Sequence, residues 1–173
     1  MKLSSEQRNA LSDFCDIILC GHNEDAFQCC VRCFENDPDE TTAAESVLYV
    51  LSGFEIDGTK VTEPQFYLVS TDSGAPELED FFWFVDNIKK SRGLSFTLDS
   101  EKFSESCCID TWLSELANQL NDLYIVSFDG VSEDFHFTIM NKDDSIKAME
   151  LFGRFTANIA GYEHSSSIFA HLD

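Results

Sequence analysis

The feature that most constrains the fold is a pair of strand-like segments late in the chain, Leu123–Asp129 and Phe135–Asn141. In the second segment Phe135, Phe137 and Ile139 alternate with polar residues, which is the period of a strand with one buried face. Two strands joined by a loop as short as 130–134 pair as an antiparallel hairpin. Since most of the remaining pattern is helical, the chain is predicted to be α+β, with helices packed on a small, mainly antiparallel sheet.

The spacing of apolar residues predicts three helices in the first part of the chain. Ser4 and Gln7 form a candidate capping box at the start of the first helix. A glycine or a proline then provides a stop signal after each helix. The predicted ranges are about 5–20, 23–35 and 39–52.

The rest of the chain continues this alternation of helices and short strands. A strand is predicted at Gln65–Ser70, and a helix after Pro76 carries the run Phe81–Phe84, which is apolar all round and should be covered on more than one side. The other predicted elements are a candidate short strand at Leu94–Leu98, helices at Ile109–Leu120 and from Asp143 to about Ile159, and a tail at 165–173 that is either an edge strand or unstructured. About six helices thus belong to one domain spanning residues 1–173.

Charge is the strongest indication of function. The chain has 32 acidic and 11 basic residues among 173, a formal net charge of −21. Such a charge repels nucleic acid and anionic membranes and attracts basic surfaces. Because 13% of the residues are aromatic, the chain is expected to fold around a Phe-rich core and not to remain a disordered acidic tail. Solubility alone is the competing explanation for the acidity.

The acidic residues gather in two segments that are predicted to be turns or helix starts. Between Cys33 and Asp86 the sole basic residue is Lys60. Side chains at such positions project into solvent, so we expect both clusters to contact a basic protein partner. These candidate binding residues are Glu35, Asp37, Asp39 and Glu40 in the first cluster, and Asp72, Glu77, Glu79 and Asp80 in the second. The loop Asp129–Asp134 is the alternative binding surface.

The seven cysteines are compatible with a zinc site or with a reduced hydrophobic core. Cys29, Cys30 and Cys33 could combine with His22 and the pair Cys107–Cys108. However, the first three lie within a predicted helix, and adjacent residues direct one side chain away, whereas zinc sites usually pair two compact ligand turns. Reduced cysteine behaves as a small hydrophobe. We therefore expect core cysteines, with neither a metal nor a cofactor.

No catalytic motif is present in the sequence. It contains no G-x-S-x-G, P-loop or G-x-G-x-x-G pattern. The histidines at 22, 136, 164 and 171 are expected on the surface, with His136 on the outward face of its strand. Asp129, Glu133 and Asp134, like Asp143 and Asp144, lack the spacing of a calcium-binding loop. We therefore expect no enzymatic activity.

The expected location is the cytoplasm. No apolar stretch approaches the roughly 20 residues of a membrane-spanning helix, and the N-terminal residues 1–10 are polar, unlike a signal peptide. The seven cysteines also argue against a secreted disulfide scaffold, because their number is odd and they include two pairs of adjacent residues.

In general character, as a small acidic α+β chain without catalytic motifs, the protein resembles the immunity proteins of bacterial toxin systems, including contact-dependent growth inhibition. The resemblance implies a non-enzymatic protein that binds a cognate toxin domain and blocks its active-site cleft. With this charge, the toxin would be basic, and a nuclease fits best. The chain is also similar in charge to DNA-mimicking anti-restriction proteins, so an acidic module that regulates a nucleic-acid-binding protein is the alternative. An enzyme using a cysteine or carboxylate site is the third.

Overall fold

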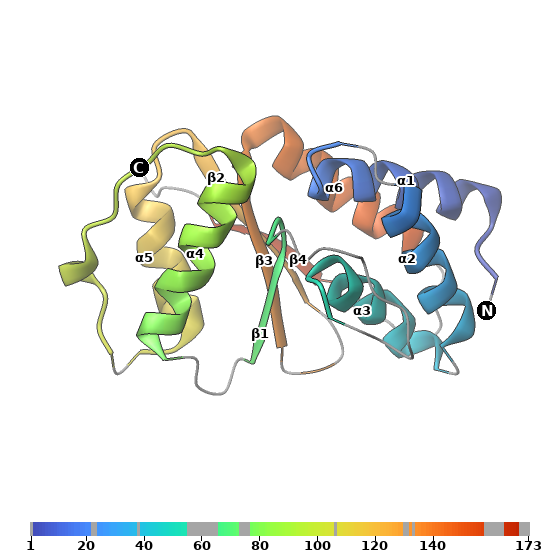
Figure 1. Ribbon diagram of the computed structural model, residues 1–173, viewed down its shortest axis with the longest axis horizontal. Coiled ribbons are helices and arrows are strands. Elements are labelled where there is room, and N and C mark those ends of the chain that lie inside the picture. Colours follow the sequence, from blue (N-terminus) through green and yellow to red (C-terminus); the bar gives the residue numbers. More distant parts are fainter. Residues whose placement is uncertain are drawn as a thin grey trace.

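The computed structural model describes residues 2–21, 24–37, 39–54, 66–72, 77–105, 107–129, 132, 134–157 and 165–169 (Figure 1). Within these residues, six α-helices pack on a four-stranded antiparallel sheet, which confirms the α+β prediction. In chain order the elements are α1 (Ser5–Ile18), α2 (Glu24–Asn36), α3 (Glu40–Leu51), β1 (Val69–Asp72), α4 (Leu78–Arg92), the short 3₁₀-helix η1 (Ser100–Lys102), α5 (Ile109–Gln119), β2 (Leu123–Asp129), β3 (Asp134–Asn141), α6 (Lys142–Phe155) and β4 (Ser165–Phe169).

The sheet is built around the predicted hairpin. Its strand order is β1-β3-β2-β4, and all three pairings are antiparallel. Ile125 lies opposite Ile139 in the hairpin, and Ser70 of β1 lies opposite His136 of β3. The C-terminal segment 165–169 adds β4 to the outer edge of β2, so the edge-strand alternative for this part of the tail is confirmed.

Helices cover both faces of the sheet. In Figure 1, α4 and α5 lie on one side of it, and α1, α2, α3 and α6 lie on the other. Successive strand residues therefore enter different cores: Ile125 and Ile139 pack with α4 and α5, whereas Val126 and Met140 pack with the four remaining helices. The sheet is the shared middle layer of two hydrophobic cores.

This double coverage overturns the expected surface position of His136. Both His136 and Thr138 have an exposed fraction of 0%, although they alternate with Phe137 and Ile139 as the residues of an outer face would. The alternation in β3 separates two buried faces, one of which contains polar residues. A period-2 pattern cannot distinguish solvent from such a polar-lined core, because both accept His and Thr.

Several predicted boundaries also differ from the structure. β1 begins at Val69, not near Gln65, and the chain turns just before it, where Phe66 has a φ of 52°. Residues 94–98 make no strand pairing within the described part of the chain, and the Lys89 ammonium donates to the Phe96 carbonyl (2.6 Å). The last helix ends at Phe155; Ile159 lies outside the described residues. In the run Phe81–Phe84, Phe81 is buried but Trp83 is 51% exposed. The prediction that this run is covered on more than one side of its helix is therefore wrong for Trp83.

The N-terminus of α1 is fixed as its sequence predicts. The Ser4 hydroxyl accepts from the Gln7 amide (3.2 Å), and the Ser4 amide donates to Gln7 Oε1 (3.0 Å), which completes the capping box. The side-chain amide of Gln7 also donates to the carbonyls of Phe155 and Ala157. This cap therefore also joins the first helix to the end of the last one.

A partly buried arginine connects the helices on opposite faces of the sheet. Arg92 ends α4, and its guanidinium donates to the Ile18 carbonyl at the end of α1 (2.6 Å) and to the Thr138 hydroxyl of β3 (2.9 Å). It also donates to the Tyr67 carbonyl (3.3 Å) and to the Cys20 thiol (3.2 Å). Burial lowers the pKa of Arg92. Positive charge at the C-terminal end of α1 is favoured by the helix dipole.

Most of the cysteines lie in the core, as predicted. Cys15, Cys29, Cys30 and Cys33 are buried between the N-terminal helices. Cys107 is half-buried, and Cys20 and Cys108 are exposed, so the expectation of core cysteines is wrong for these last two; all of the cysteines are free thiols. A hydrogen bond with the Cys15 thiol, together with burial, raises the pKa of Cys30 well above its usual value. The Cys30 thiol therefore remains protonated at neutral pH. The buried cysteines pack as small apolar side chains.

Candidate functional site: an aromatic pocket at the edge of the sheet

The first predicted acidic cluster is partly used to hold the fold together. Glu35 is paired with Arg8 (2.5 Å), and the Arg8 hydrogen bond lowers its pKa in spite of partial burial. The Asp37 carboxylate accepts from the Asp39 amide (2.9 Å) and from the hydroxyls of Thr42 and Ser46, which fixes the start of α3. Asp39 itself is exposed, and the Glu40 side chain lies outside the described residues. Glu35 and Asp37 are therefore less available to a partner than their sequence positions suggested.

The second predicted cluster is more open. Glu77, Glu79 and Asp80 are all exposed at the N-terminus of α4, where negative charge is favoured by the helix dipole. Asp72 is the last residue of β1, and its side chain lies outside the described residues. In Figure 1 the connection between α2 and α3 is at the right of the molecule and α4 is at the left. The structure thus places the two clusters on different parts of the molecule instead of on one continuous patch.

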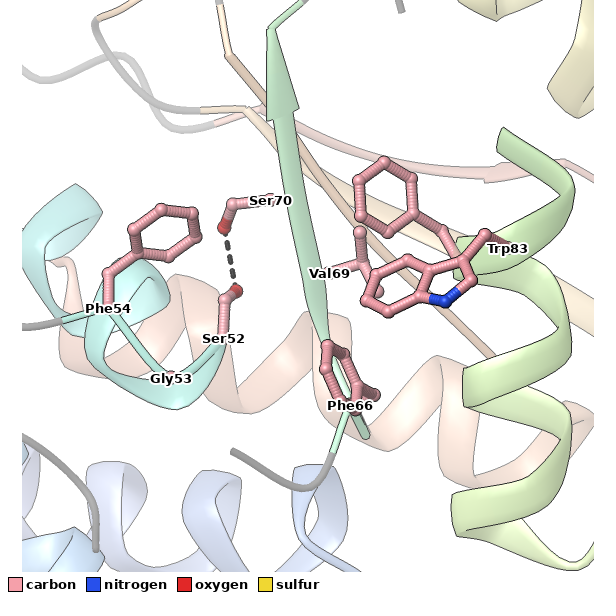
Figure 2. A pocket seen from close by; sticks show the side chains of 8 residues that line it. Ser52, Gly53, Phe54, Phe66, Val69, Ser70 and Trp83 are labelled. Atoms are coloured by element: carbon pink, nitrogen blue, oxygen red, sulfur yellow. Dashed lines mark hydrogen bonds between the residues drawn. The ribbon is translucent and has the colours of Figure 1, made fainter. Parts of the chain in front are cut away.

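A pocket of about 280 Å³ lies at the free edge of β1 (Figure 2). The end of α3 forms one wall and α4 forms the other, with β1 between them. The lining residues are Ser52, Gly53, Phe54, Phe66, Val69, Ser70, Trp83 and Phe84. Most of this surface is apolar, and Ser52 and Ser70 are the residues with polar side-chain hydroxyls among those that line it. Apolar pockets with a few fixed polar groups are the usual form of a ligand-binding site.

The aromatic walls of the pocket are held by local backbone geometry. Gly53 has a φ of 90°, which a residue with a side chain rarely adopts, and it turns the chain so that Phe54 packs edge-on against Tyr49 (5.7 Å between ring centroids). On the opposite wall Trp83 makes an edge contact with Phe66 (5.1 Å). Phe54 and Trp83 are nevertheless 50% and 51% exposed, which is unusual for side chains of this size.

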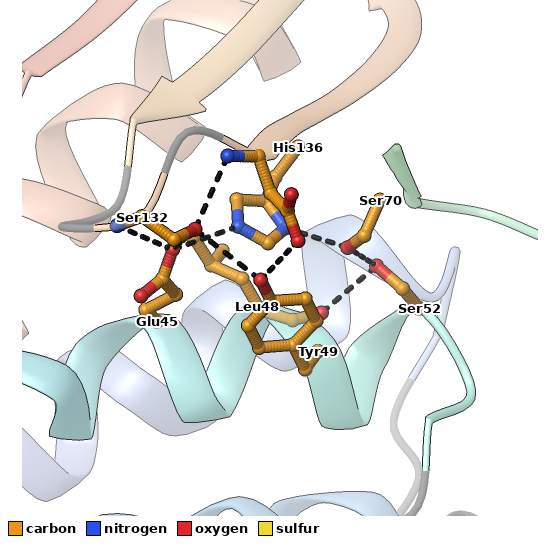
Figure 3. A network of polar contacts seen from close by, with 8 residues as sticks. Glu45, Leu48, Tyr49, Ser52, Ser70, Ser132 and His136 are labelled. Carbon is orange, nitrogen blue, oxygen red and sulfur yellow. Dashed lines mark hydrogen bonds and ion pairs between the residues drawn. The ribbon is translucent and has the colours of Figure 1, made fainter. Parts of the chain in front are cut away.

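Behind the pocket a chain of polar groups runs into the protein (Figure 3). Ser52 Oγ lies 2.6 Å from Ser70 Oγ, which lies 2.5 Å from His136 Nδ1. On the other side of the ring, His136 Nε2 is 3.6 Å from Glu45 Oε1. The chain thus begins at the pocket wall and ends at a buried carboxylate.

Glu45 is kept ionised by its neighbours. It accepts from the Ser132 amide (3.1 Å) and from the Ser132 hydroxyl. Burial opposes its ionisation, but the nearby His136 ring and the hydrogen bonds from Ser132 outweigh this effect and lower the pKa of Glu45. The carboxylate therefore fastens residue 132, which lies between β2 and β3, to α3.

Tyr49 provides a second link between α3 and the hairpin. Its hydroxyl donates to the Asp134 carboxylate and is 3.3 Å from Ser132 Oγ, while its ring packs edge-on against His136 (4.9 Å). Burial and the hydrogen bond to Asp134 raise the pKa of Tyr49 to about 12. The alternative binding surface was this hairpin loop. Two of its residues, Ser132 and Asp134, are thus already engaged in hydrogen bonds to α3.

A serine hydroxyl, an imidazole and a carboxylate in line are the groups of a nucleophilic hydrolase. Here Ser70 reaches Nδ1 of the ring, the carboxylate faces Nε2, and Ser70 Oγ is also in hydrogen-bonding contact with Ser52. The ring has no exposed surface, so the chain meets the pocket through its two serines. The arrangement can fix the position of these hydroxyls, and it could also deliver a proton to or from Ser70.

The sequence reasoning missed both the pocket and the polar chain. Their residues come from four separate elements, and none of them forms a local motif. The one signal that could have identified them was the run Phe81–Phe84, which has more apolar side chains than one buried helix face can cover.

Metal ligation and membrane insertion can be assessed for the described residues. Among them, no group of three or more His, Cys, Asp or Glu side chains is arranged to hold a metal ion. His22, which the zinc alternative requires, lies outside these residues. Over the same part of the chain, none of the helices combines the length and the apolar character needed to cross a membrane.

Comparison of the chain with protein-family models, with curated protein sequences and with solved structures finds no match.

Proposed function

We propose that the protein is an immunity-type inhibitor that binds a basic cognate toxin domain, a nuclease, and neutralises it by covering its active-site cleft. It acts in the cytoplasm as a binding protein and requires no cofactor. The observation that carries this proposal is the set of exposed acids at the N-terminus of α4, because a cleft that binds nucleic acid is lined by basic side chains.

The acids at the start of α4 surround a hollow of suitable size for basic side chains. Glu77, Glu79 and Glu105 line a depression of about 340 Å³ together with Leu78. Within the described part of the chain, none of these three carboxylates is in an ion pair. An incoming lysine or arginine would therefore meet exposed carboxylates that make no ion pair among the described residues.

Several of the eleven basic residues make contacts of their own. Arg8 pairs with Glu35, Lys90 with Asp86 (2.5 Å) and Arg154 with Glu6 (3.8 Å). Arg92 is directed inward, and Lys89 lies over the Phe96 ring (5.0 Å). With 32 acidic residues against 11 basic ones, the field around the protein is negative, and a field of this kind raises the rate of association with a basic protein.

The test is binding and neutralisation of the protein encoded by the adjacent gene. An inactive variant of that protein is purified, and its association with the wild-type chain is followed by surface plasmon resonance over a salt series. The on-rate should fall steeply as ionic strength rises, while the off-rate changes less. Absence of binding to the neighbouring gene products, or an on-rate insensitive to salt, would refute the proposal.

Charge reversal then locates the interaction. Changing Glu77, Glu79 and Asp80 to lysine should weaken protection from the toxin without unfolding the protein. The matched control is reversal of Asp110, Asp122 and Asp143, which are also exposed acids but lie outside the predicted clusters. Equal losses in both triple variants would indicate a non-specific charge effect. A binding partner that is a transcriptional or restriction protein, and not a toxin, would favour the DNA-mimic alternative.

The line from Ser70 through His136 to Glu45 supports a second candidate, an ester hydrolase acting on a small apolar acyl group held in the pocket. Ser70 Oγ would attack the acyl carbon, and its proton would pass through His136 Nδ1 to the leaving alcohol; water would then release the acid from the serine ester. A fluorophosphonate probe should label the wild type and leave Ser70→Ala unlabelled. Equal labelling of the two, or none of the wild type, excludes this candidate.

A further inference from the structure

The aromatic pocket between α3 and α4 has room for one side chain. Its volume of about 280 Å³ lies below the roughly 300–1,000 Å³ of sites that hold a drug-sized ligand. Four of the residues that line it are aromatic, namely Phe54, Phe66, Trp83 and Phe84. Figure 2 shows Phe54 on the α3 side and Trp83 on the α4 side, and both rings are half exposed. A group that fills the pocket would therefore cover both of them.

The rings are set at steep angles, like the walls of a box, and are not stacked on one another. The Trp83 ring meets Phe66 at 83° and Phe84 at 68°, with 5.1 Å and 5.4 Å between the ring centroids. On the other wall Phe54 meets Tyr49 at 77°. The face of an aromatic ring carries partial negative charge, so several rings around one cavity attract a cation placed between them.

The hydroxyls of the pocket are already hydrogen-bonded to protein groups. Ser52 Oγ donates to the Leu48 carbonyl (2.9 Å) and lies 2.6 Å from Ser70 Oγ. Ser70 Oγ in turn lies 2.5 Å from His136 Nδ1, and Ser70 is only 7% exposed, so it belongs to the floor of the pocket. Recognition of a bound group therefore depends mainly on the aromatic walls.

The charge around the pocket favours a cation from another molecule. Among the described residues, the cations that lie over aromatic rings are Lys89 and Arg92, and the rings beneath them do not line this pocket (5.0 Å and 5.7 Å to the centroids). The exposed acid Asp80 precedes Trp83 by one turn of α4, so the two lie on the same side of the helix. The net charge of −21 attracts a cation to this opening over a neutral or anionic group.

We infer that the aromatic pocket receives an arginine side chain of the basic partner. A guanidinium is planar, stacks on aromatic faces and is more weakly hydrated than an ammonium, so it loses less hydration when it enters an apolar site. Its methylene stem would contact the apolar surface of the same walls. The inference rests on the proposed function for the identity of the partner. It adds to the acids of α4 a single aromatic contact of the kind that supplies much of the binding energy at protein interfaces.

The probe is a capped tripeptide, glycine-arginine-glycine, titrated into the isotope-labelled protein at constant ionic strength and followed by NMR. The reporter is the backbone amide of Gly53, which lines the pocket and is present in every variant. A second tripeptide carries citrulline, in which a neutral urea replaces the guanidinium. We expect it to bind about two- to thirtyfold more weakly, the range expected from one cation–π contact. A third tripeptide carries norleucine, which is apolar and neutral, and it should also bind more weakly.

The variant that separates an aromatic from a merely apolar site is Trp83→Leu, because leucine keeps an apolar surface but has no aromatic face. It should weaken binding of the arginine tripeptide by about two- to thirtyfold, as should Phe54→Leu. The matched control is Ile146→Ala, because Ile146 is 50% exposed but does not line the pocket. Circular dichroism checks that each variant is folded, and the comparison of the three tripeptides on the wild type needs no variant.

Three results would overturn the inference. The first is binding of the citrulline or norleucine tripeptide to the wild type as tightly as the arginine tripeptide. The second is equal binding of the arginine tripeptide to Trp83→Leu and to Ile146→Ala. The third is a dimer of the wild-type chain that Trp83→Leu dissociates in analytical ultracentrifugation, because a second copy would then be the occupant.

The toxin-binding assay separates this inference from the proposed function. If Trp83→Leu and Phe54→Leu bind the toxin as the wild type does while charge reversal on α4 abolishes binding, the function stands and the arginine site is wrong. If the arginine tripeptide binds in the pocket as expected but no toxin partner is bound, the site stands and the proposed function is wrong.

Discussion

The substitution Glu45→Gln tests the polar chain behind the pocket. Glutamine keeps the shape of the side chain and one oxygen acceptor, so it removes the charge and little else. The Glu45 carboxylate accepts two hydrogen bonds from Ser132 and lies 3.6 Å from His136 Nε2. Hydrogen bonds to a charged group contribute about 1.5–3 kcal/mol, and those between neutral groups about 0.5–1.5 kcal/mol. Conversion of two charged bonds to neutral ones should therefore lower the free energy of unfolding by about 2 kcal/mol at pH 7.

The loss should depend on pH in a defined direction. Because the folded protein lowers the pKa of Glu45 from its ordinary value of 4.5, the carboxylate stabilises the fold fully above that pH. Its contribution is lost as the pH falls through the lower, folded-state pKa. The stability difference between wild type and Glu45→Gln should thus be constant near neutrality and should shrink in acid, below the ordinary pKa.

Urea unfolding followed by tryptophan fluorescence, at a series of pH values from neutral to acid, measures this difference. Glu79→Gln is the matched control: Glu79 is an exposed glutamate, and a surface substitution should change stability by less than about 0.5 kcal/mol. The reasoning is refuted if Glu45→Gln is as stable as the wild type at pH 7, or if its deficit does not diminish in acid.

Three further experiments address other parts of the structure. Arg92→Met removes the guanidinium donors to Ile18, Thr138, Tyr67 and Cys20, and should lower the free energy of unfolding by roughly 2–4 kcal/mol in urea; a loss within about 0.5 kcal/mol would contradict the bridging role. Titration followed by absorbance at the phenolate band should show that Tyr49 ionises near pH 12, and this transition should be absent in Tyr49→Phe. Because the folded-state pKa is raised, the stabilisation by Tyr49 is present below about pH 10 and is lost between there and pH 12. Iodoacetamide should modify Cys20 and Cys108 in the native protein, as detected by mass spectrometry, but should modify Cys15, Cys29, Cys30 and Cys33 only after unfolding. Rapid labelling of these four cysteines in the native protein would exclude their assignment to the core.

The elements with strong local signals were predicted well from the sequence. The capping box at Ser4, the helix 109–120 and the hairpin strands all follow from patterns of nearby residues. The strand at 69–72 was misplaced because its start depends on the backbone turn at Phe66, which no local residue preference indicates. Local patterns also could not reveal that α3 and α6 cover the polar face of β3, so His136 was assigned to the surface.

The candidate site was predicted only as far as charge could indicate it. The acids at the start of α4 are exposed as expected, but Glu35 and Asp37 have structural partners that lie far away along the chain or in the next turn. The pocket unites α3, β1 and α4, and the polar chain adds β3. Such a site is created by tertiary packing, and residues like Ser70 and His136, which are separated by 66 positions, carry no sequence mark of their contact.

The position of the hairpin at residues 123–141 has a consequence for synthesis of the protein on the ribosome. Both hydrophobic cores are closed by β2 and β3, yet α1 to α5 precede these strands in the chain and leave the exit tunnel before them. Until then the apolar faces of five helices, including those rich in phenylalanine and cysteine, have no sheet to pack on. The chain must therefore complete its fold after most of it has emerged. Until then, repulsion among acidic side chains opposes association of the unpacked helices with other nascent copies of the chain.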